Sequence, residues 1–370
     1  MPLILCYIFL CLSLIYSIAT LLVIAGNRKK YKIIYRVPSV SIVLAARNEE
    51  AVIEKCLKTL KIQNYPKEKL EIIVIDDRSE DKTCKVASDF IKGKPQFKLI
   101  LISDPPQGLT GKANALKIGI ENSRGEIILS TDADCEVPPN WVSSMVSYFS
   151  DDVGLVAGFS TPPTKGWFAS LQALDHLFLI SVASGFAGLG IAQSCIGNNI
   201  AFRRNAYDAV GGYDGVGFTV TEDAGLLRAI VKKTNYQISF NLTKPSLVTT
   251  RAARNLKELT SQRMRWLNGG IQAGRLMLIC LGLTFALVLL TASTLVSWTV
   301  HGLEIYSAIA AVIFMGANLS IIMVNHRFIG ISRILRWFIP HQLFFLLYSL
   351  YFGVLYIMKR NEIQWKGRAY

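Results

Sequence analysis

Short apolar runs alternate with amphipathic segments in the first half of the chain. Buried strands are expected where Val, Ile and Leu gather, at residues 40–45, 70–75, 97–102, 126–131 and 153–159. Helical periodicity predicts helices at residues 47–60, 81–92, 112–122 and 141–149. Strands and helices that alternate through short connections indicate a parallel sheet with right-handed crossovers. The pattern therefore predicts an α/β domain with a mostly parallel sheet.

Longer apolar segments flank this domain. They occupy residues 3–25, 276–300, 303–324 and 337–358, and each is long enough to span a hydrocarbon core about 30 Å thick. The first segment has too long an apolar run for a signal peptide, and it lacks a basic start and a small-residue cleavage site. We therefore interpret it as a membrane anchor. The basic residues at 28–36 place its C-terminal side in the cytoplasm.

The sequence leaves the number of membrane crossings open. Residues 167–191 are apolar, but Gln172, Asp175 and His176 interrupt them and the glycines at 185–190 weaken a helix, so we favour a helix at the membrane surface over a further span. Basic residues between the last two spans and in the C-terminal tail both favour the cytoplasm, although one complete crossing would separate them.

Three regions follow from this pattern. They are an N-terminal transmembrane anchor at residues 1–27, a cytoplasmic domain at 28–272 that ends in an interfacial helix, and a C-terminal transmembrane region with a basic tail at 273–370. A chain organised in this way is expected to be a multi-pass protein of the cell (inner) membrane. No obligatory protein partner is evident.

Charge and cysteine usage exclude several classes of function. Much of the net charge of +14 lies near the predicted membrane borders, where anionic headgroups attract it. Aromatic residues do not interleave with the basic ones as in RNA-binding motifs, so nucleic acid is not an expected partner. The seven cysteines form no CxxC pair and the four histidines form no HExxH motif. A disulfide framework, a zinc site and a histidine-based metal site are therefore not expected.

Acidic residues follow two of the predicted strands. The strand at 126–131 continues into Asp132-Ala133-Asp134, and the strand at 70–75 ends in Asp76-Asp77. Carboxylates at the end of a buried strand are costly without a positive partner, and they are hard ligands for a divalent cation. Because the carboxyl ends of parallel strands share one edge of a sheet, we expect the four aspartates to converge.

Other motifs have ordinary structural explanations when each is taken alone. Asn48 and Thr221 fit helix N-caps followed by acidic residues, and the second helix would bury a face that includes Val231. The glycines at 211–215 are typical of a turn. The string at 108–112 lacks the spacing of a phosphate loop, so we interpret it as a loop that delivers Lys112. The glycines at 185–190 likewise do not match the dinucleotide fingerprint.

The order of the motifs is more specific than any one of them. An Asp-Asp strand end, a DxD strand end, a Thr-Glu-Asp helix start at 221–223 and a Gln-x-x-Arg-Trp string at 262–266 follow one another between membrane spans. Residues 39–270 resemble the membrane-bound family 2 glycosyltransferases, which have a GT-A fold in the cytoplasm. The tail at 365–370 is similar to the closing motif of ceramide- and carotenoid-type lipid glycosyltransferases.

This resemblance implies an inverting transfer of a sugar from a nucleotide-diphosphate sugar, with a UDP-sugar favoured. Asp223 would be the general base, and Asp132 and Asp134 would hold Mg²⁺ or Mn²⁺. The residues implied in donor binding are Ala46, Arg47, Asp76, Asp77, Lys112, Asp132 and Arg265. Those implied in acceptor binding are Glu222, Gln262 and Trp266.

The acceptor is the least constrained part of the hypothesis. We favour a hydroxyl of a membrane lipid, because three C-terminal spans without a further domain are few for a secretion channel. The alternative is a processive polysaccharide synthase that uses the same motifs. A non-enzymatic membrane scaffold would have lost a catalytic carboxylate, and every expected carboxylate is present.

Overall fold

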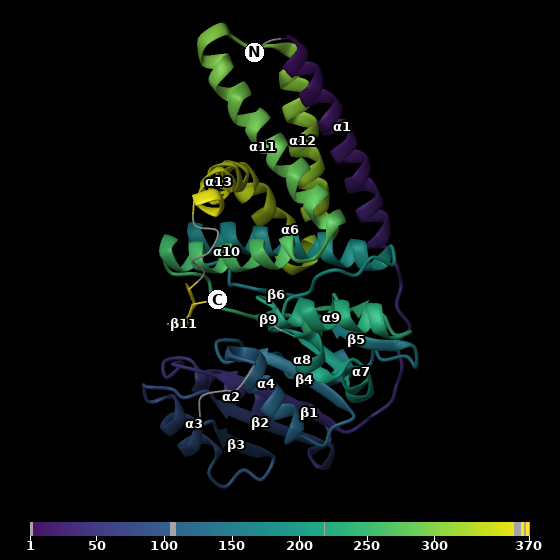
Figure 1. The fold of residues 1–370 in the computed structure, drawn as a ribbon, viewed down its shortest axis with the longest axis vertical. Coiled ribbons are helices and arrows are strands. Elements are labelled where there is room, and N and C mark those ends of the chain that lie inside the picture. The colour runs from purple at the N-terminus through teal and green to yellow at the C-terminus, as the bar shows by residue number, and fades with distance from the viewer. Residues whose placement is uncertain (1–2, 104–108, 218, 359–363, 366–367, 370) are drawn as a thin grey trace. The chain divides into compact units, whose positions relative to one another are not determined.

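The structure is a computed structural model that describes residues 3–103, 109–217, 219–358, 364–365 and 368–369 (Figure 1). The chain divides into two compact units, each assembled from separate stretches. The sheet unit comprises Lys30–Pro163 and Ala192–Arg251. The helical unit comprises Met1–Lys29, Thr164–Ile191 and Ala252–Tyr370.

A seven-stranded sheet in the order β3-β2-β1-β4-β7-β5-β8 forms the centre of the sheet unit. Its strands are β1 (Val40–Ala46), β2 (Leu70–Asp76), β3 (Phe97–Leu101), β4 (Ile127–Asp132), β5 (Val153–Ala157), β7 (Ile200–Arg203) and β8 (Gln237–Phe240). The pairs β1–β2, β1–β4, β2–β3 and β5–β8 are parallel, whereas β7 runs antiparallel to β4 and β5. The predicted mostly parallel sheet is confirmed, and β7 and β8 are strands that the sequence patterns missed.

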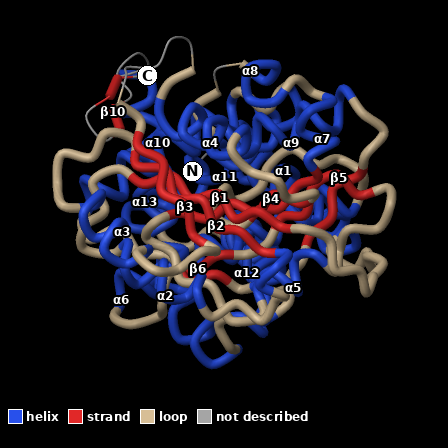
Figure 2. Tube along the Cα trace, turned by 90° about the horizontal axis from the view of Figure 1, so that it is seen from below, coloured by secondary structure: helices blue, strands red, loops and turns tan. Residues whose placement is uncertain are grey.

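Helices cover both faces of this sheet (Figure 2). They are α2 (Ile53–Lys61), α3 (Thr83–Ile91), α4 (Gly111–Glu121), α5 (Trp141–Val146), α7 (Arg204–Ala209), α8 (Gly212–Val216) and α9 (Glu222–Lys233). On one face, Ile42 and Leu44 of β1 share a buried core with Leu57 of α2 and Trp141 of α5. Helix α4 packs on β1 and β2 from the other face. A short parallel pair, β6 (Ser160–Thr161) and β9 (Val248–Thr249), lies outside the main sheet.

Three local expectations for the sheet unit are wrong. Asn48 does not cap α2, because it adopts a left-handed conformation with a φ of 54° and its Oδ1 accepts the Glu80 N–H at 2.9 Å. The expected turn at 211–215 is the short helix α8, which follows Gly211 at a φ of 79°. Val231 is 39% exposed, while Leu226, Leu227 and Ile230 form the buried face of α9.

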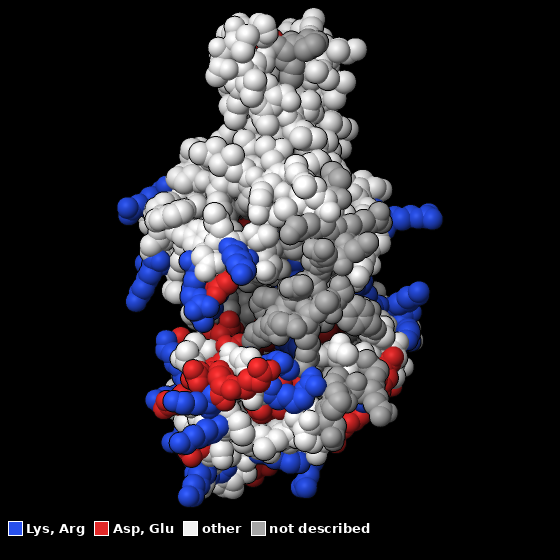
Figure 3. Space-filling model, turned by 60° about the vertical axis from the view of Figure 1, so that its left-hand side comes forward, with Lys and Arg blue, Asp and Glu red and all other residues white. Residues whose placement is uncertain are grey.

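The helical unit consists of α1 (Leu3–Gly26), α6 (Trp167–Gly188), α10 (Leu256–Ile271), α11 (Arg275–His301), α12 (Ile305–Val324) and α13 (Ile331–Met358). Five of these helices, all except α10, are long and apolar enough to cross a membrane. The upper part of Figure 3 is nearly free of charged side chains. The location of α6 at a membrane surface stays a prediction. Of the tail motif, residues 366, 367 and 370 lie outside the described residues, and β10 (Gln364–Trp365) pairs with β11 (Arg368–Ala369).

The glycines near the end of α6 have a packing role that the sequence did not predict. The helix continues to Gly188, and its glycines allow its backbone to touch that of α1. A Cβ atom on Gly26 would lie 2.0 Å from the Gly185 carbonyl oxygen, and one on Gly188 would lie 1.9 Å from the Gly26 carbonyl oxygen. The Asn27 amide fixes the same crossing, since its Nδ2 donates to the Ser181 carbonyl at 2.7 Å.

A buried ion pair joins α6 to α10. Asp175, whose side chain is 1% exposed, forms an ion pair with Arg263, with 2.5 Å between Asp175 Oδ2 and Arg263 Nη2, and the exposed fraction of the Arg263 side chain is 5%. Tyr348 of α13 donates to the other Asp175 oxygen at 2.9 Å, and the Arg263 guanidinium stacks on the Trp266 ring at 4.1 Å. Because each charge would be expensive to bury alone, the pair constrains how three apolar helices pack.

Removing one partner of this pair should be far more costly than removing both. We expect Asp175→Asn to destabilise the protein by about 3–5 kcal/mol, because Arg263 is left buried without its counter-ion. The double variant Asp175→Leu/Arg263→Met should regain most of that loss. Thermal unfolding of the detergent-purified protein measures both effects. Glu258→Gln, which breaks the exposed Arg254 pair, is the control and should change stability by less than about 1 kcal/mol. Equal losses in the single and double variants would contradict the ion-pair argument.

Candidate active site

The ends of three neighbouring strands bring the acidic residues to one edge of the sheet. In the strand register Asp76 of β2 pairs with Ala46 of β1, and Asp132 of β4 pairs with Ala45. Asp77 continues from β2 and donates its backbone N–H to the Ala46 carbonyl at 2.9 Å. The parallel arrangement therefore places Asp76 and Asp132 on either side of the end of β1, as the sequence predicts.

Asp132 and Asp134 offer hard oxygen ligands at this edge. Within the described ranges no group of three or more His, Cys, Asp and Glu side chains is arranged to hold a metal ion. A cation bound here would have to complete its shell with water and ligand oxygens, which suits Mg²⁺ or Mn²⁺. The neighbouring Cys135 does not supply a soft thiolate ligand, because burial, and then the charge of Asp134, raises the pKa of its thiol. The residues present therefore fit a divalent cation that is shared with a phosphorylated ligand.

Lys112 connects this edge to the first turn of α9. Its ammonium lies 2.6 Å from Asp132 Oδ1 and 3.0 Å from Glu222 Oε1. Burial opposes the charged ammonium, but the carboxylates of Asp132 and Glu222 outweigh it and raise the pKa of Lys112. The lysine is the second residue of α4, so a helix start delivers it to the site. Residues 104–108 of the loop that precedes it lie outside the described residues.

Asp223 has the properties of a general base. The residue is buried, with 9% of its surface exposed. Burial, together with the adjacent Glu222 charge, raises its pKa from 3.8 to about 6, and Lys112 opposes that rise. A carboxylate with a pKa near neutrality can take up a proton in a reaction and release it afterwards. Such a perturbed group beside an acidic cluster marks a candidate site.

Sequence reasoning missed the loop at 193–199, which packs against the Asp223 carboxylate. A Cβ atom on Gly197 would lie 2.8 Å from Asp223 Oδ2, so a larger residue would displace the acid. Thr131 of β4 donates to the Asn198 carbonyl at 2.9 Å, and the Asn199 side chain is hydrogen-bonded to Trp141, Phe159 and Ser246. The only signal in the sequence is the polar string Gly-Asn-Asn before β7.

Arg47 and the Asp-Asp turn lie together beside β1. Arg47 donates to the Asp77 carbonyl at 3.2 Å and pairs with Glu80 at 3.4 Å. Asp76 Oδ2 accepts the Ser79 N–H at 3.2 Å. Its other oxygen is buried and has no hydrogen-bond partner in the part of the chain that the structure describes. An unsatisfied buried oxygen at a strand end suits a ligand that brings a donor.

The remaining predicted residues belong to the other unit. Gln262, Arg265 and Trp266 lie on α10 of the helical unit, where the Trp266 ring packs edge-on against His176 with a centroid distance of 5.2 Å. Their places in donor and acceptor binding stay predictions.

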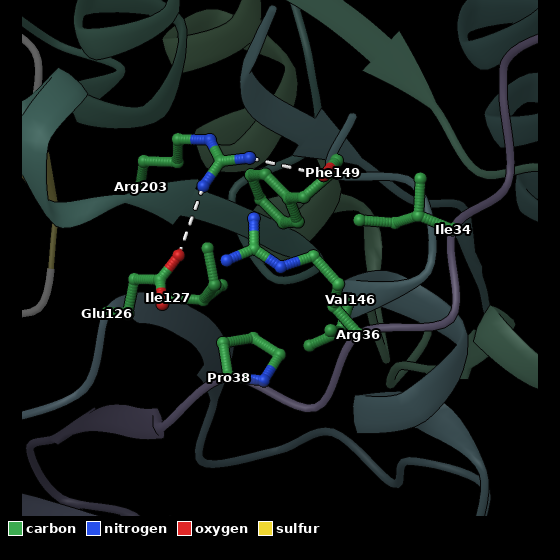
Figure 4. A pocket seen from close by; sticks show the side chains of 8 residues that line it. All are labelled: Ile34, Arg36, Pro38, Glu126, Ile127, Val146, Phe149 and Arg203. Carbon is green, nitrogen blue, oxygen red and sulfur yellow. Dashed lines mark hydrogen bonds and ion pairs between the residues drawn. The ribbon is translucent and has the colours of Figure 1, made fainter. Parts of the chain in front are cut away.

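A hollow elsewhere on the sheet unit is distinct from the candidate site. The hollow of Figure 4 is lined by Ile34, Arg36, Pro38, Glu126, Ile127, Val146, Phe149 and Arg203. Because Glu126 and Ile127 are at the amino end of β4, this hollow lies at the sheet edge opposite Asp132. It is therefore not part of the candidate site.

Comparison with known proteins identifies the class. The sequence profile described as glycosyl transferase family 2 matches residues 41–211, and that described as glycosyl transferase family group 2 matches residues 127–356. The chain therefore belongs to the family 2 glycosyltransferases.

Two curated relatives differ in the products that their names state. A beta-monoglucosyldiacylglycerol synthase of Nostoc sp. is 34% identical over 245 residues, which are 64% of this chain and 49% of that protein. A poly-beta-1,6-N-acetyl-D-glucosamine synthase of Staphylococcus epidermidis is 26% identical over 239 residues, which are 64% of this chain and 55% of that protein. The chain thus spans about half the length of the curated relatives that it matches.

A solved structure confirms the fold. The mannosyltransferase PcManGT of Pyrobaculum calidifontis, in complex with GDP-Man and Mn²⁺, superposes with a TM-score of 0.62 at 19% identity. The match covers 92% of this chain and 96% of that one. The predicted GT-A fold is therefore correct.

The raised pKa of Asp223 predicts a stability effect with a definite sign. Asp223 ionises with a pKa of 3.8 in the unfolded chain, but in the folded protein burial delays its ionisation until about pH 6. The free energy of unfolding therefore falls as the pH rises from 3.8 through about 6. A pKa change from 3.8 to about 6 corresponds to about 3 kcal/mol. We expect Asp223→Asn to be more stable than the parent protein at pH 8, by up to about that amount, and to show little gain at pH 4. Thermal unfolding in EDTA at both pH values measures this difference, and an equal gain at both would contradict the assignment.

Proposed function

We propose that the protein is a metal-dependent, inverting glycosyltransferase that moves a sugar from a nucleotide-diphosphate sugar, with UDP favoured, to a hydroxyl of a membrane lipid. The observation that carries this proposal is the pairing of a buried base, Asp223, with the Asp132–Asp134 strand end through Lys112 and Glu222. Membership of the family supplies the reaction class.

Asp132 and Asp134 would hold Mg²⁺ or Mn²⁺. When bound, the cation supplies positive charge for the diphosphate that leaves as the glycosidic bond breaks. The complex of PcManGT with GDP-Man and Mn²⁺ supports this choice. Lys112 already lies on the metal-ligand side of the site and is placed to add a further positive charge.

The nucleoside would lie against Arg47, Asp76 and Asp77 at the end of β1. The unsatisfied Asp76 oxygen offers an acceptor for a hydroxyl or amino group of the nucleotide. Arg265 of α10 is proposed to bind the diphosphate, and the Ala46 backbone borders the nucleoside site. Glu222, Gln262 and Trp266 are proposed to contact the acceptor.

Asp223 would deprotonate the acceptor hydroxyl. The oxygen attacks the anomeric carbon from the face opposite the diphosphate, a new C–O bond forms as the bond to the diphosphate breaks, and the configuration inverts. The proton ends on Asp223, whose pKa near 6 allows it to release that proton to solvent between turnovers.

A lipid acceptor is supported by two observations. The chain is similar to a beta-monoglucosyldiacylglycerol synthase, and it has five helices long and apolar enough to cross a membrane. The basic residues at 28–36 place the catalytic unit in the cytoplasm in this proposal. The similarity to a poly-beta-1,6-N-acetyl-D-glucosamine synthase keeps a processive synthase as the second candidate.

The product distinguishes the two candidates. We expect purified protein, Mn²⁺, radiolabelled UDP-sugars and mixed membrane lipids to yield a discrete product that partitions into organic solvent. A polymer of high mass would support the synthase instead. Asp223→Asn should form neither product while still binding UDP, because only the base is lost. Retained turnover in that variant would remove Asp223 as the base.

Loss of Asp134 should affect the metal-dependent part of catalysis. We expect Asp134→Ala to lower kcat/KM by about a hundredfold or more at fixed Mn²⁺, because charge stabilisation by the cation is worth several kcal/mol. A Mn²⁺ titration of initial rates measures the effect. Asp151→Ala, which removes an exposed aspartate paired with Arg36, is the matched control and should retain full activity. An unchanged Mn²⁺ dependence in Asp134→Ala would exclude it as a ligand.

A further inference from the structure

Lys112 is paired with the carboxylate of Asp132, which is also a proposed metal ligand. It bridges two carboxylates from different elements, Asp132 at the end of β4 and Glu222 at the start of α9. Both contacts are at ion-pair distance, and the Lys112 side chain is 31% exposed. The ammonium is therefore held by two ion pairs, while part of the Lys112 side chain stays accessible to solvent.

A divalent cation bound to Asp132 would compete with the Lys112 ammonium for the negative charge of the Asp132 carboxylate. A carboxylate has two oxygens, so both positive groups can share Asp132, but two cations on one carboxylate repel each other in a partly buried site. A diphosphate changes this balance, because it offers Lys112 new anionic partners and offers the cation new oxygen ligands.

We propose that Lys112 is a resident counter-ion that suppresses metal binding until the nucleotide arrives. In the donor-free protein the lysine neutralises Asp132 and Glu222, so the cation binds weakly. When the diphosphate binds, Lys112 transfers to it and releases Asp132 to the cation. Metal and nucleotide then bind cooperatively, and the protein without nucleotide has a low affinity for the cation. This inference rests on the proposed function, since it takes Asp132 and Asp134 as the metal ligands.

Replacing Lys112 should change the affinities for Mn²⁺ and for UDP in opposite directions. Lys112→Met should bind Mn²⁺ alone about tenfold or more tightly than the parent protein, because the competing charge is gone. The same variant should bind UDP alone more weakly, because a partner of the diphosphate is lost. The factor by which UDP raises Mn²⁺ affinity should therefore be smaller in Lys112→Met, and the reciprocal effect of Mn²⁺ on UDP must shrink equally.

The experiment measures binding rather than turnover. Free Mn²⁺ is followed by electron paramagnetic resonance in titrations of the full-length protein in detergent, with and without saturating UDP, and UDP binding is followed by calorimetry with and without Mn²⁺. Asp134→Ala defines the background from other Mn²⁺ sites. Lys112→Gln is a second neutral variant, in case the Met substitution does not fold.

Lys117 provides a matched control. It lies on the same helix, α4, and forms an ion pair with Asp214 at 2.6 Å, with 29% of its side chain exposed. Lys117→Met removes the same charge from the same helix but not from the Asp132–Glu222 pair. We expect its Mn²⁺ and UDP affinities to stay within about twofold of the parent values, because the ion pairs of Lys117 are with Glu121 and Asp214 and not with Asp132 or Glu222.

Three results would overturn the proposal, and the first two separate it from the proposed function. If the parent protein binds Mn²⁺ in the presence of UDP but neither Lys112 variant gains affinity for Mn²⁺ alone, the counter-ion role is wrong and the metal site stands. If the parent protein binds no Mn²⁺ above the Asp134→Ala background even with UDP, both the metal assignment and the counter-ion role are wrong. A gain in Lys117→Met equal to that in Lys112→Met would also overturn it, since any lost charge would then suffice.

Discussion

The need to compensate buried carboxylates governs the design of the sheet unit. Parallel strands bring Asp76 and Asp132 to the same edge, and α9 adds Glu222 and Asp223 nearby. Negative charges packed in this way destabilise a fold unless cations accompany them. Lys112 provides one such cation. In the proposed function, a bound metal and the diphosphate would change these partners, so ligand binding would also alter how the carboxylates are compensated.

The surrounding structure holds this edge in place. The core beneath β1 fixes the strand ends, and the Thr131 contact ties the loop at 193–199 to β4. That loop in turn presents Gly197 to the Asp223 carboxylate without leaving room for a side chain. Asp223 and the predicted metal ligands are thus positioned by hydrogen bonds and packing that converge on β4. Precision of this kind is what a reaction with an oriented nucleophile requires.

The helical unit meets the same physical problem in apolar surroundings. It pairs Asp175 with Arg263 and adds Tyr348 and Trp266 around them, so no charge of the pair is buried alone. Close contact of glycine backbones joins α1 to α6. These contacts connect helices that are far apart in sequence, and they explain why polar residues and glycines interrupt otherwise apolar segments. Because of the same interruptions, the sequence pattern favours a helix at the membrane surface for α6 over a membrane span.

The sequence by itself determined the α/β alternation, the long apolar helices and the acidic strand ends, because hydrophobic period and run length are local properties. The order of four motifs was enough to indicate the family and the GT-A fold. Only the tertiary structure decided that Lys112 bridges Asp132 and Glu222, that Gly197 faces Asp223, and that Asn48 does not cap a helix. These features depend on side chains that meet from distant parts of the chain, and no local pattern encodes such a meeting.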